Sequence, residues 1–244
     1  MKIQIHPDYT EYTEFLQHIP HDNYAVEKVF CNHRNTVEKV TYNKEAFVIK
    51  KFKTPLLINR IIYTWFRKSK ARRSYEYAEE LQKKGVDTAR PIAYIEEKKN
   101  GLFHTGYFIS QYLPYPLLPE TELLNEEEIL QLKDDFLHFT VHLHQSKIIH
   151  KDYNPRNILY HKVGDTYRFA LLDINRLKFD SSNLRLCMQA INQLMMDWED
   201  LLSFTVKYTQ VRNLDTTRCL LILLNNRKYI ERRNRRKKLL KKLK

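Results

Sequence analysis

The stretch His150–Leu159, HKDYNPRNIL, carries a basic residue, an acid and an amide in one short polar run. Apolar pairs flank it, with Ile148-Ile149 before it and Ile158-Leu159 at its end. Polar runs that contain Asn and Pro between apolar segments are typical of loops. Residues 126–145 have an approximate helical stripe of apolar side chains, and residues 158–162 have the composition of a strand. We therefore predict a loop that leads from a helix to a strand.

The polar residues of this loop have the spacing H-x-D-x-x-x-x-N, formed by His150, Asp152 and Asn157, and Asp173 ends the apolar strand FALLD. Phosphoryl transfer needs a carboxylate beside the attacking hydroxyl, and oxygen ligands that hold Mg²⁺ against the nucleotide phosphates. We expect Asp152 to be the base, and Asn157 and Asp173 to be the metal ligands. His150 is expected to brace this catalytic loop. His150 and Asp152 alone would equally suit an ordinary turn beside a buried histidine, but the full set, with the segments that flank it, favours a phosphoryl-transfer site.

A cation for the phosphates is expected from the strand FVIKKF, in which Lys50 and Lys51 point to opposite faces. The form F-V-I-K matches V-A-I-K, whose lysine contacts the nucleotide in protein kinases, so Lys50 is favoured. Such a lysine pairs with a glutamate on a helix. Glu76 is the expected partner, with Glu79 and Glu80 as the alternatives.

Two further segments are expected to line the site for ATP. The strand end SQYL, with Gln111, Tyr112 and Leu113, would supply backbone groups to the adenine. The chain has only 4 glycines, and CNHRNTV stands where a glycine-rich loop would cover the phosphates. Within it, Arg34 and Asn35 would either contact the phosphates or shape a turn, and the sequence leaves both roles open.

The order of the predicted elements indicates an α+β protein. Strand-like runs occur in the first half and helical patterns in the second, with a break near residues 113–118. The predicted strands are 27–30, 37–42, 47–52, 89–98, 102–113, 158–162 and 168–174, and the predicted helices are 58–84, 126–145 and most of the chain from 182. We expect three parts: a β-rich nucleotide-binding lobe (1–113), a helical catalytic lobe (114–226) and a basic tail (227–244).

The composition of the chain indicates where in the cell the protein is expected to work. The net charge is +13, and residues 227–244 hold 11 Lys or Arg and one acid, so the basicity is concentrated in this tail. The three scattered cysteines predict a reducing compartment rather than a disulfide framework. There is no run of about 18 apolar residues and no signal-peptide pattern at the start. A cytoplasmic location is therefore expected.

Several of these segments together resemble a known family. HKDYNPRNILY, the strand end LLDIN, RNTV and SYEYAEELQKKGVDTARPIAYIE are similar to the Kdo/WaaP (InaA-type) lipopolysaccharide kinases, over roughly residues 20–205. The resemblance implies a two-lobed protein-kinase-like fold with a short, mainly helical C-terminal lobe. It also implies ATP- and Mg²⁺-dependent phosphorylation of a Kdo or heptose hydroxyl in the lipopolysaccharide inner core, at the cytoplasmic face of the inner membrane of Gram-negative bacteria.

The basic tail suits such a location, because its Lys and Arg residues would meet anionic headgroups while its leucines enter the interface. A frayed, solvated end is the alternative, and nucleic acid is not an expected partner, because no face of interleaved aromatic and basic residues is evident. The chain also departs from protein kinases, with D-I-N at 173–175 instead of D-F-G and no A-P-E after it. A small atypical protein kinase of the RIO/Bud32 type, and a non-catalytic pseudokinase that binds nucleotide and membrane, remain alternatives.

Overall fold

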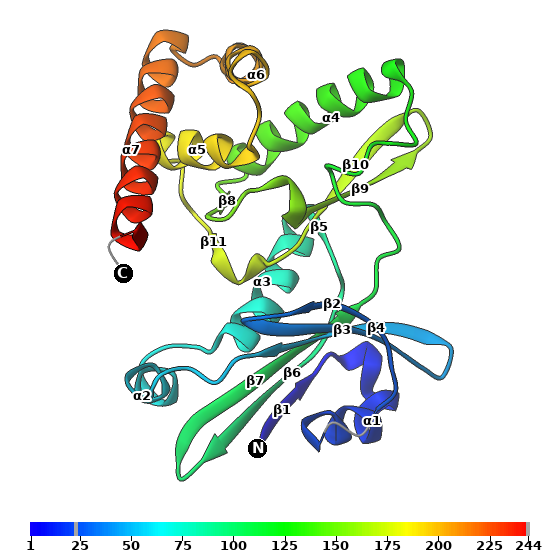
Figure 1. The fold of residues 1–244 in the computed structure, drawn as a ribbon. Coiled ribbons are helices and arrows are strands. Elements are labelled where there is room, and N and C mark those ends of the chain that lie inside the picture. The colour runs from blue at the N-terminus through cyan, green and yellow to red at the C-terminus, as the bar shows by residue number, and fades with distance from the viewer. Residues whose placement is uncertain (22–23, 243–244) are drawn as a thin grey trace. The chain divides into compact units, whose positions relative to one another are not determined.

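Strands dominate the first 114 residues and helices dominate the remainder, which confirms the predicted α+β class (Figure 1). The computed structural model describes residues 1–21 and 24–242, without the side chains of 231 and 233–242. The chain forms two compact units. The N-terminal unit comprises Met1–Pro114 with Asp173–Asn175, and the C-terminal unit comprises Tyr115–Leu172 with Arg176–Lys244.

The N-terminal unit is built on a six-stranded antiparallel sheet in the order β1-β6-β7-β4-β3-β2. The strands predicted at 27–30, 37–42 and 47–52 are confirmed as β2, β3 and β4, which pair antiparallel in that order. The strands predicted at 89–98 and 102–113 are confirmed as β6 and β7, which form an antiparallel hairpin. The strands of this unit are β1 (Lys2–Ile5), β2 (Val26–Asn32), β3 (Asn35–Tyr42), β4 (Glu45–Phe52), β5 (Asp87–Thr88), β6 (Pro91–Lys99) and β7 (Leu102–Gln111).

Each face of this sheet has its own apolar core, covered by a different helix (Figure 1). The short helix α1 (Thr13–His18) covers the face that contains Phe47 and Ile49, and α3 (Lys70–Lys83) covers the face that contains Phe52. Side chains alternate along a strand. Lys50 therefore lies on the α3 face of β4, and Lys51 lies on the α1 face.

The helix predicted over 58–84 is two helices, α2 (Leu57–Trp65) and α3. The break has a local cause, because Ser69 is the N-cap of α3 and its side chain accepts a hydrogen bond from Arg72 N at 3.1 Å. A serine that caps a new helix satisfies one of the amides that the first turn leaves unpaired. The end of α3 agrees with the sequence, since Gly85 follows it with a φ of +67°.

The C-terminal unit packs helices around a small hairpin. Phe136 of α4 contacts Phe169 of the hairpin edge-to-face, with 5.2 Å between the ring centroids. Its ring centroid lies 6.0 Å from that of Phe204 of α6. The predicted strand 168–174 ends early, at Leu171, because Asp173 has a φ of +48°, outside the extended region. The elements are α4 (Glu126–Gln145), β8 (Ile149–His150), β9 (Ile158–Val163), β10 (Thr166–Leu171), β11 (Leu177–Lys178), α5 (Leu184–Ile191), α6 (Trp198–Val211) and α7 (Thr216–Lys242).

The predicted basic tail lies at the end of α7, and most of its side chains fall outside the described residues. Among the residues that are described, none of the helices combines the length and the apolar character that a bilayer crossing requires.

A fully buried histidine joins α4 to α6 in the C-terminal unit. Tyr208 Oη lies 2.8 Å from His144 Nδ1, and Arg212 donates to the same hydroxyl. Burial, with a smaller contribution from the charge of Arg212, lowers the pKa of His144 to about 3. The imidazole is therefore neutral in the folded protein at neutral pH.

His144 should make the protein sensitive to acid. Its pKa is about 3 when folded, against 6.5 for the free side chain, so the unfolded chain takes up a proton first as the pH falls below 6.5. The free energy of unfolding should then decrease by up to about 1.4 kcal/mol per pH unit from this residue. Urea unfolding at a series of pH values below 6.5 measures this decrease in the free energy of unfolding. His144→Gln should show a shallower decline than the exposed control His138→Gln, and equal slopes would contradict the assignment.

Candidate functional site

The loop between β8 and β9 is anchored to α4 through Tyr153. The Tyr153 hydroxyl lies 2.9 Å from the Thr140 hydroxyl, and its ring stacks on Phe136 at 6.0 Å. Tyr153 is fully buried, and this burial raises the pKa of its phenol. The preceding residue, Asp152, keeps its side chain 33% exposed. The anchor therefore holds the backbone beside Asp152 while the carboxylate remains accessible.

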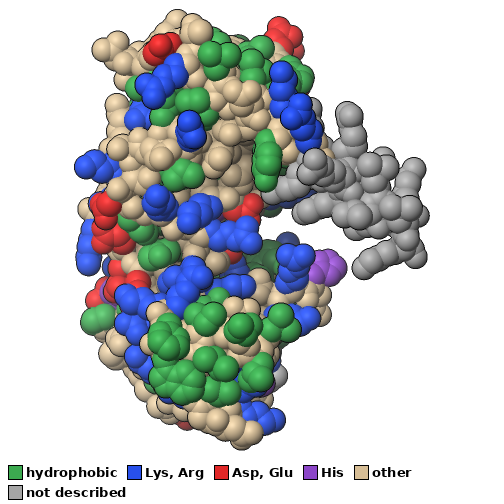
Figure 2. Space-filling view, turned by 90° about the vertical axis from the view of Figure 1, so that its left-hand side faces the viewer, with side chains coloured by type: hydrophobic (Ala, Val, Ile, Leu, Met, Phe, Trp, Pro, Cys, Tyr) green, Lys and Arg blue, Asp and Glu red, His purple; other side chains and the backbone are tan. Residues whose placement is uncertain are grey.

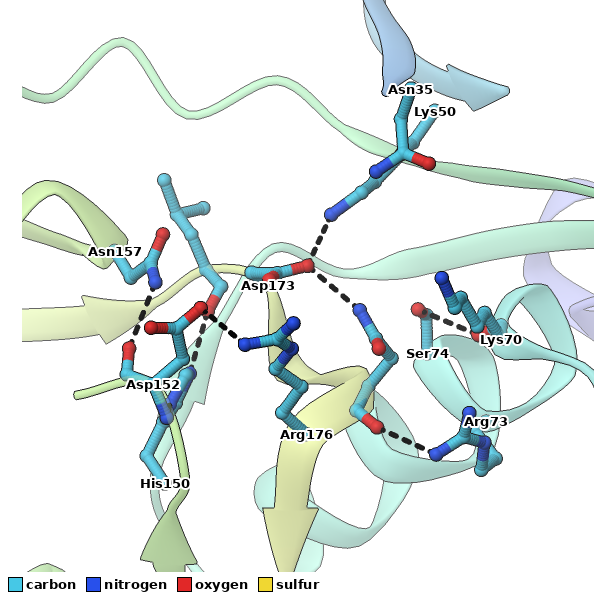
Figure 3. Close-up of polar contacts among 12 residues, drawn as sticks. Asn35, Lys50, Lys70, Arg73, Ser74, His150, Asp152, Asn157, Asp173 and Arg176 are labelled. Atoms are coloured by element: carbon cyan, nitrogen blue, oxygen red, sulfur yellow. Dashed lines mark hydrogen bonds and ion pairs between the residues drawn. The ribbon is translucent and has the colours of Figure 1, made fainter. Parts of the chain in front are cut away.

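His150 is buried and braces this loop with both ring nitrogens (Figure 3). Its Nδ1 accepts from Asp152 N at 3.1 Å, and its Nε2 lies 2.9 Å from Leu172 O. Because an amide N–H can only donate, Nδ1 is the acceptor and Nε2 carries the proton. The imidazole therefore links the start of the loop to the residue that follows β10.

Asn157 closes the loop in an orientation that suits a cation ligand. Its Nδ2 donates to Asp152 O at 2.9 Å (Figure 3), and its backbone carbonyl accepts from Leu172 N at 2.8 Å. The amide nitrogen is thus already bonded, and Oδ1 is the atom that could ligate a hard cation. Leu172 is bonded by both His150 and Asn157, so the residue before Asp173 is fixed to the loop.

The Asp152 carboxylate forms an ion pair that the sequence analysis missed. Arg176 Nη1 donates to Asp152 Oδ2 at 2.9 Å (Figure 3), and the arginine side chain is 54% exposed. Charge-assisted bonds are shorter and stronger than neutral ones, and this one orients the carboxylate. The sequence offered one indication of this pair. Arg176 lies three residues after Asp173 and directly before β11, and β11 pairs with β8 at the start of the loop.

The Asp173 carboxylate is held by two side chains of the N-terminal unit. Its Oδ1 accepts from Lys50 Nζ at 2.5 Å and from Asn175 Nδ2 at 2.7 Å (Figure 3). Its backbone is left-handed, with a φ of +48°, a conformation that is uncommon for residues other than glycine and that Asp adopts more readily than most. The structure therefore brings together Lys50 and Asp173, two of the predicted site residues, while their roles toward a nucleotide stay predictions.

The predicted ion pair between Lys50 and Glu76 is wrong. Glu76 accepts instead from Lys68 Nζ at 2.7 Å and from Arg72 Nε at 2.8 Å. Burial acts to raise the pKa of Glu76, but these two hydrogen bonds outweigh it and lower that pKa. Arg72 lies four residues before Glu76 on the same helix face, and such a local partner needs no long-range approach.

Arg73 joins α3 to the segment that carries Asp173. Its Nη1 donates to Asn175 O at 3.0 Å, and Asn175 in turn donates to the Asp173 carboxylate (Figure 3). Burial lowers the pKa of Arg73, and the charge of Arg67 adds to this effect. We expected α3 to contact the site through an ion pair between Glu76 and Lys50. Instead, α3 contacts it through the hydrogen bond from Arg73 to the backbone carbonyl of Asn175.

The other predicted nucleotide contacts lie at two ends of the sheet. Arg34 is in the tight turn between β2 and β3, and Asn35 Oδ1 accepts from Lys53 N at 3.4 Å. Both also line a cavity of about 540 Å³, together with Lys51.

At the end of β7, two of the three predicted adenine contacts have backbone partners. Gln111 N donates to Arg90 O and Tyr112 N donates to Ala46 O, both at 2.9 Å. Within the described chain, Leu113 N is the amide of this trio without such a partner. Its role toward the adenine stays a prediction.

Comparison with known proteins identifies the fold as protein-kinase-like. The structure of "WaaP in complex with acyl carrier protein" superposes with a TM-score of 0.64 at 15% identity, covering 97% of this chain and 99% of that one. The Rio2 kinase–ADP/Mg²⁺–phosphoaspartate complex from Chaetomium thermophilum superposes with a TM-score of 0.52 at 14% identity, covering 84% of this chain and 62% of that one. No model of a known protein family matches the sequence, and no curated protein matches it.

His150 should be needed for stability. Removing a buried side chain whose two nitrogens are bonded leaves Leu172 O and Asp152 N unpaired, at a cost of about 1–3 kcal/mol for each group. His150→Ala should therefore lower the free energy of unfolding in urea by about 2–5 kcal/mol. The exposed His138→Ala should change it by less than about 0.5 kcal/mol. Equal, small effects would show that the brace does not hold the loop.

Proposed function

We propose that this protein is an ATP-dependent kinase that phosphorylates a Kdo or heptose hydroxyl of the lipopolysaccharide inner core. One observation carries the proposal: Leu172 is bonded by both His150 and Asn157, and the next residue is Asp173, whose carboxylate is held by Lys50. This arrangement supports a site with an amide oxygen, a carboxylate and a phosphate-binding cation in fixed order along the chain.

The donor set fits ATP and Mg²⁺. Asn157 Oδ1 and an Asp173 carboxylate oxygen are hard ligands of the type that Mg²⁺ prefers, and they would hold it together with phosphate oxygens. The metal would supply charge neutralisation at the transferring phosphoryl group. Lys50 would exchange its contact with Asp173 for the phosphates, and Leu113 N would donate to the adenine. Arg34 and Asn35 are proposed to contact the phosphates from the turn between β2 and β3.

Asp152 would act on the acceptor. Its carboxylate would accept the proton of the attacking sugar hydroxyl and orient that oxygen toward the phosphorus. Arg176 is a positioning residue in this account, because it holds Asp152 Oδ2 and leaves Oδ1 for the hydroxyl. His150 would contribute by fixing the backbone amide of Asp152.

The nature of the acceptor is supported by two features. D-I-N stands at 173–175 where protein kinases have D-F-G, the motif that begins their activation segment. The likeness to WaaP spans both chains almost completely, whereas the match leaves more than a third of the Rio2 chain uncovered. With the sequence resemblance, these features favour a glycolipid acceptor at the cytoplasmic face of the inner membrane.

Turnover with a defined acceptor tests the proposal. Purified protein with Mg²⁺ and ATP should consume ATP faster when a Kdo-containing lipid A is added. Asp152→Asn should lower that acceptor-dependent rate by about 10²-fold or more, because it removes the base and retains the shape. Asp165→Asn, in the exposed turn after β9, is the matched control and should have no effect.

The other outcomes separate the alternatives. Phosphate transfer to a serine peptide but not to the sugar would favour an atypical protein kinase. ATP binding without turnover on any acceptor, unchanged by Asp152→Asn, would favour a pseudokinase.

The unusual anchor of α3 gives a second test. Arg73→Met should weaken Mg²⁺–ATP binding about tenfold, because Asn175 and with it the Asp173 carboxylate lose their tie to α3. Glu76→Gln should change it less than about twofold, since Glu76 binds Lys68 and Arg72 rather than Lys50. Titration calorimetry measures both. The reverse ranking would mean that the glutamate pairs with Lys50 when nucleotide binds.

A further inference from the structure

Helix α2 exposes its apolar side instead of burying it. Its nine residues include none that is buried, and apolar residues on and beside it are between 37% and 80% exposed. These residues are Leu56, Leu57, Ile58, Ile61, Trp65 and Phe66. An amphipathic helix of a globular protein normally turns such a face to the core. Contiguous exposed apolar patches mark interaction sites.

The polar side of α2 fastens it to the sheet. Arg60 Nε donates to Phe103 O at 2.8 Å, and Phe103 N donates to Thr64 Oγ1 at 2.9 Å. Arg60 also donates to Lys99 O at 3.2 Å. Because these bonds hold the polar face against β6 and β7, the apolar face points outward as a fixed ridge.

The charge around this ridge is mainly positive. Between Glu45 and Glu76 the sequence holds nine Lys or Arg and no Asp or Glu. Lys53, Arg67 and Lys68 border α2 and are exposed. Figure 2 shows apolar side chains gathered in the lower part of the view with Lys and Arg side chains beside them.

A cavity at the C-terminal end of α2 continues the positive surface. It has a volume of about 490 Å³, and Trp65 and Phe66 form part of its wall. Five Lys or Arg side chains line it against one acid, Glu96. Such a cavity suits an anionic headgroup beside an apolar anchor.

We propose that α2 and its basic border dock this protein onto an anionic phospholipid bilayer. The apolar ridge would enter the boundary between headgroups and acyl chains, with Trp65 at that boundary and Lys53, Arg67 and Lys68 at the phosphates. A second copy of the chain is disfavoured, because it would bring two surfaces of the same charge together. This docking does not depend on the proposed reaction.

Vesicle binding by the full-length protein tests the surface. The protein should sediment with phosphatidylcholine vesicles that contain about 30% phosphatidylglycerol, and much less with phosphatidylcholine alone. Leu57→Asp/Ile58→Asp should weaken binding about tenfold or more. Leu123→Asp/Leu130→Asp adds the same charge at two other exposed leucines and should change binding less than about twofold. Equal losses in both double variants would overturn the proposal.

Tryptophan fluorescence locates the contact. The chain has 2 tryptophans, so Trp198→Phe leaves Trp65 as the only tryptophan, which excitation near the red edge selects over tyrosine. Its emission should shift to the blue on vesicle binding and be quenched by brominated acyl chains. An unshifted emission in the bound state would overturn the proposal, because the ridge would then remain in water.

Two further outcomes would also overturn it. The first is vesicle binding that survives Leu57→Asp/Ile58→Asp and is lost when Leu239, Leu240 and Leu243 of the tail are changed to serine. The second is binding of an acidic acyl carrier protein that the α2 double variant abolishes while vesicle binding is unchanged. That result would make α2 a protein-docking helix.

Discussion

The contacts of one carboxylate, that of Asp173, organise the N-terminal half of the candidate site. Lys50 and Asn175 both bond its Oδ1, and its left-handed backbone turns the chain sharply after Leu172. A residue in that conformation persists only where its surroundings hold it. Here Leu172 is bonded on one side by His150 and Asn157, and Asn175 is bonded on the other by Arg73. The position of the proposed metal ligand thus depends on a few named hydrogen bonds.

The departures from protein kinases have a common physical explanation in this network. Where D-F-G would have glycine, Asn175 supplies an amide that holds Asp173 and a carbonyl that receives Arg73. The glutamate of α3 is then free to pair within its own neighbourhood, with Lys68 and Arg72. The hydrogen bond that joins α3 to the site therefore runs from Arg73 to the backbone carbonyl of Asn175. It forms while Lys50 remains bonded to Asp173.

Short-range rules predicted much of the fold and part of the site. Period-two alternation on β4 put Lys50 and Lys51 on opposite faces, and α4 followed from its apolar stripe. The rest depended on contacts that spacing does not encode. The partner of Glu76 was decided by competition among several nearby cations, and Arg176 reaches Asp152 only once β11 pairs with β8. The outward face of α2 was missed because the same periodicity describes a buried helix and an exposed one.

The proposed roles of Asp173 and Asn157 as ligands of the cation that accompanies the nucleotide can be measured directly. The experiment is Mn²⁺ binding followed by electron paramagnetic resonance, with ATP carrying ¹⁷O in its phosphates. We expect a bound Mn²⁺ whose lines are broadened by the labelled phosphates, with affinity lowered about tenfold or more in Asp173→Asn and also reduced in Asn157→Ala. Unchanged Mn²⁺ affinity in Asp173→Asn would show that this carboxylate is not a ligand.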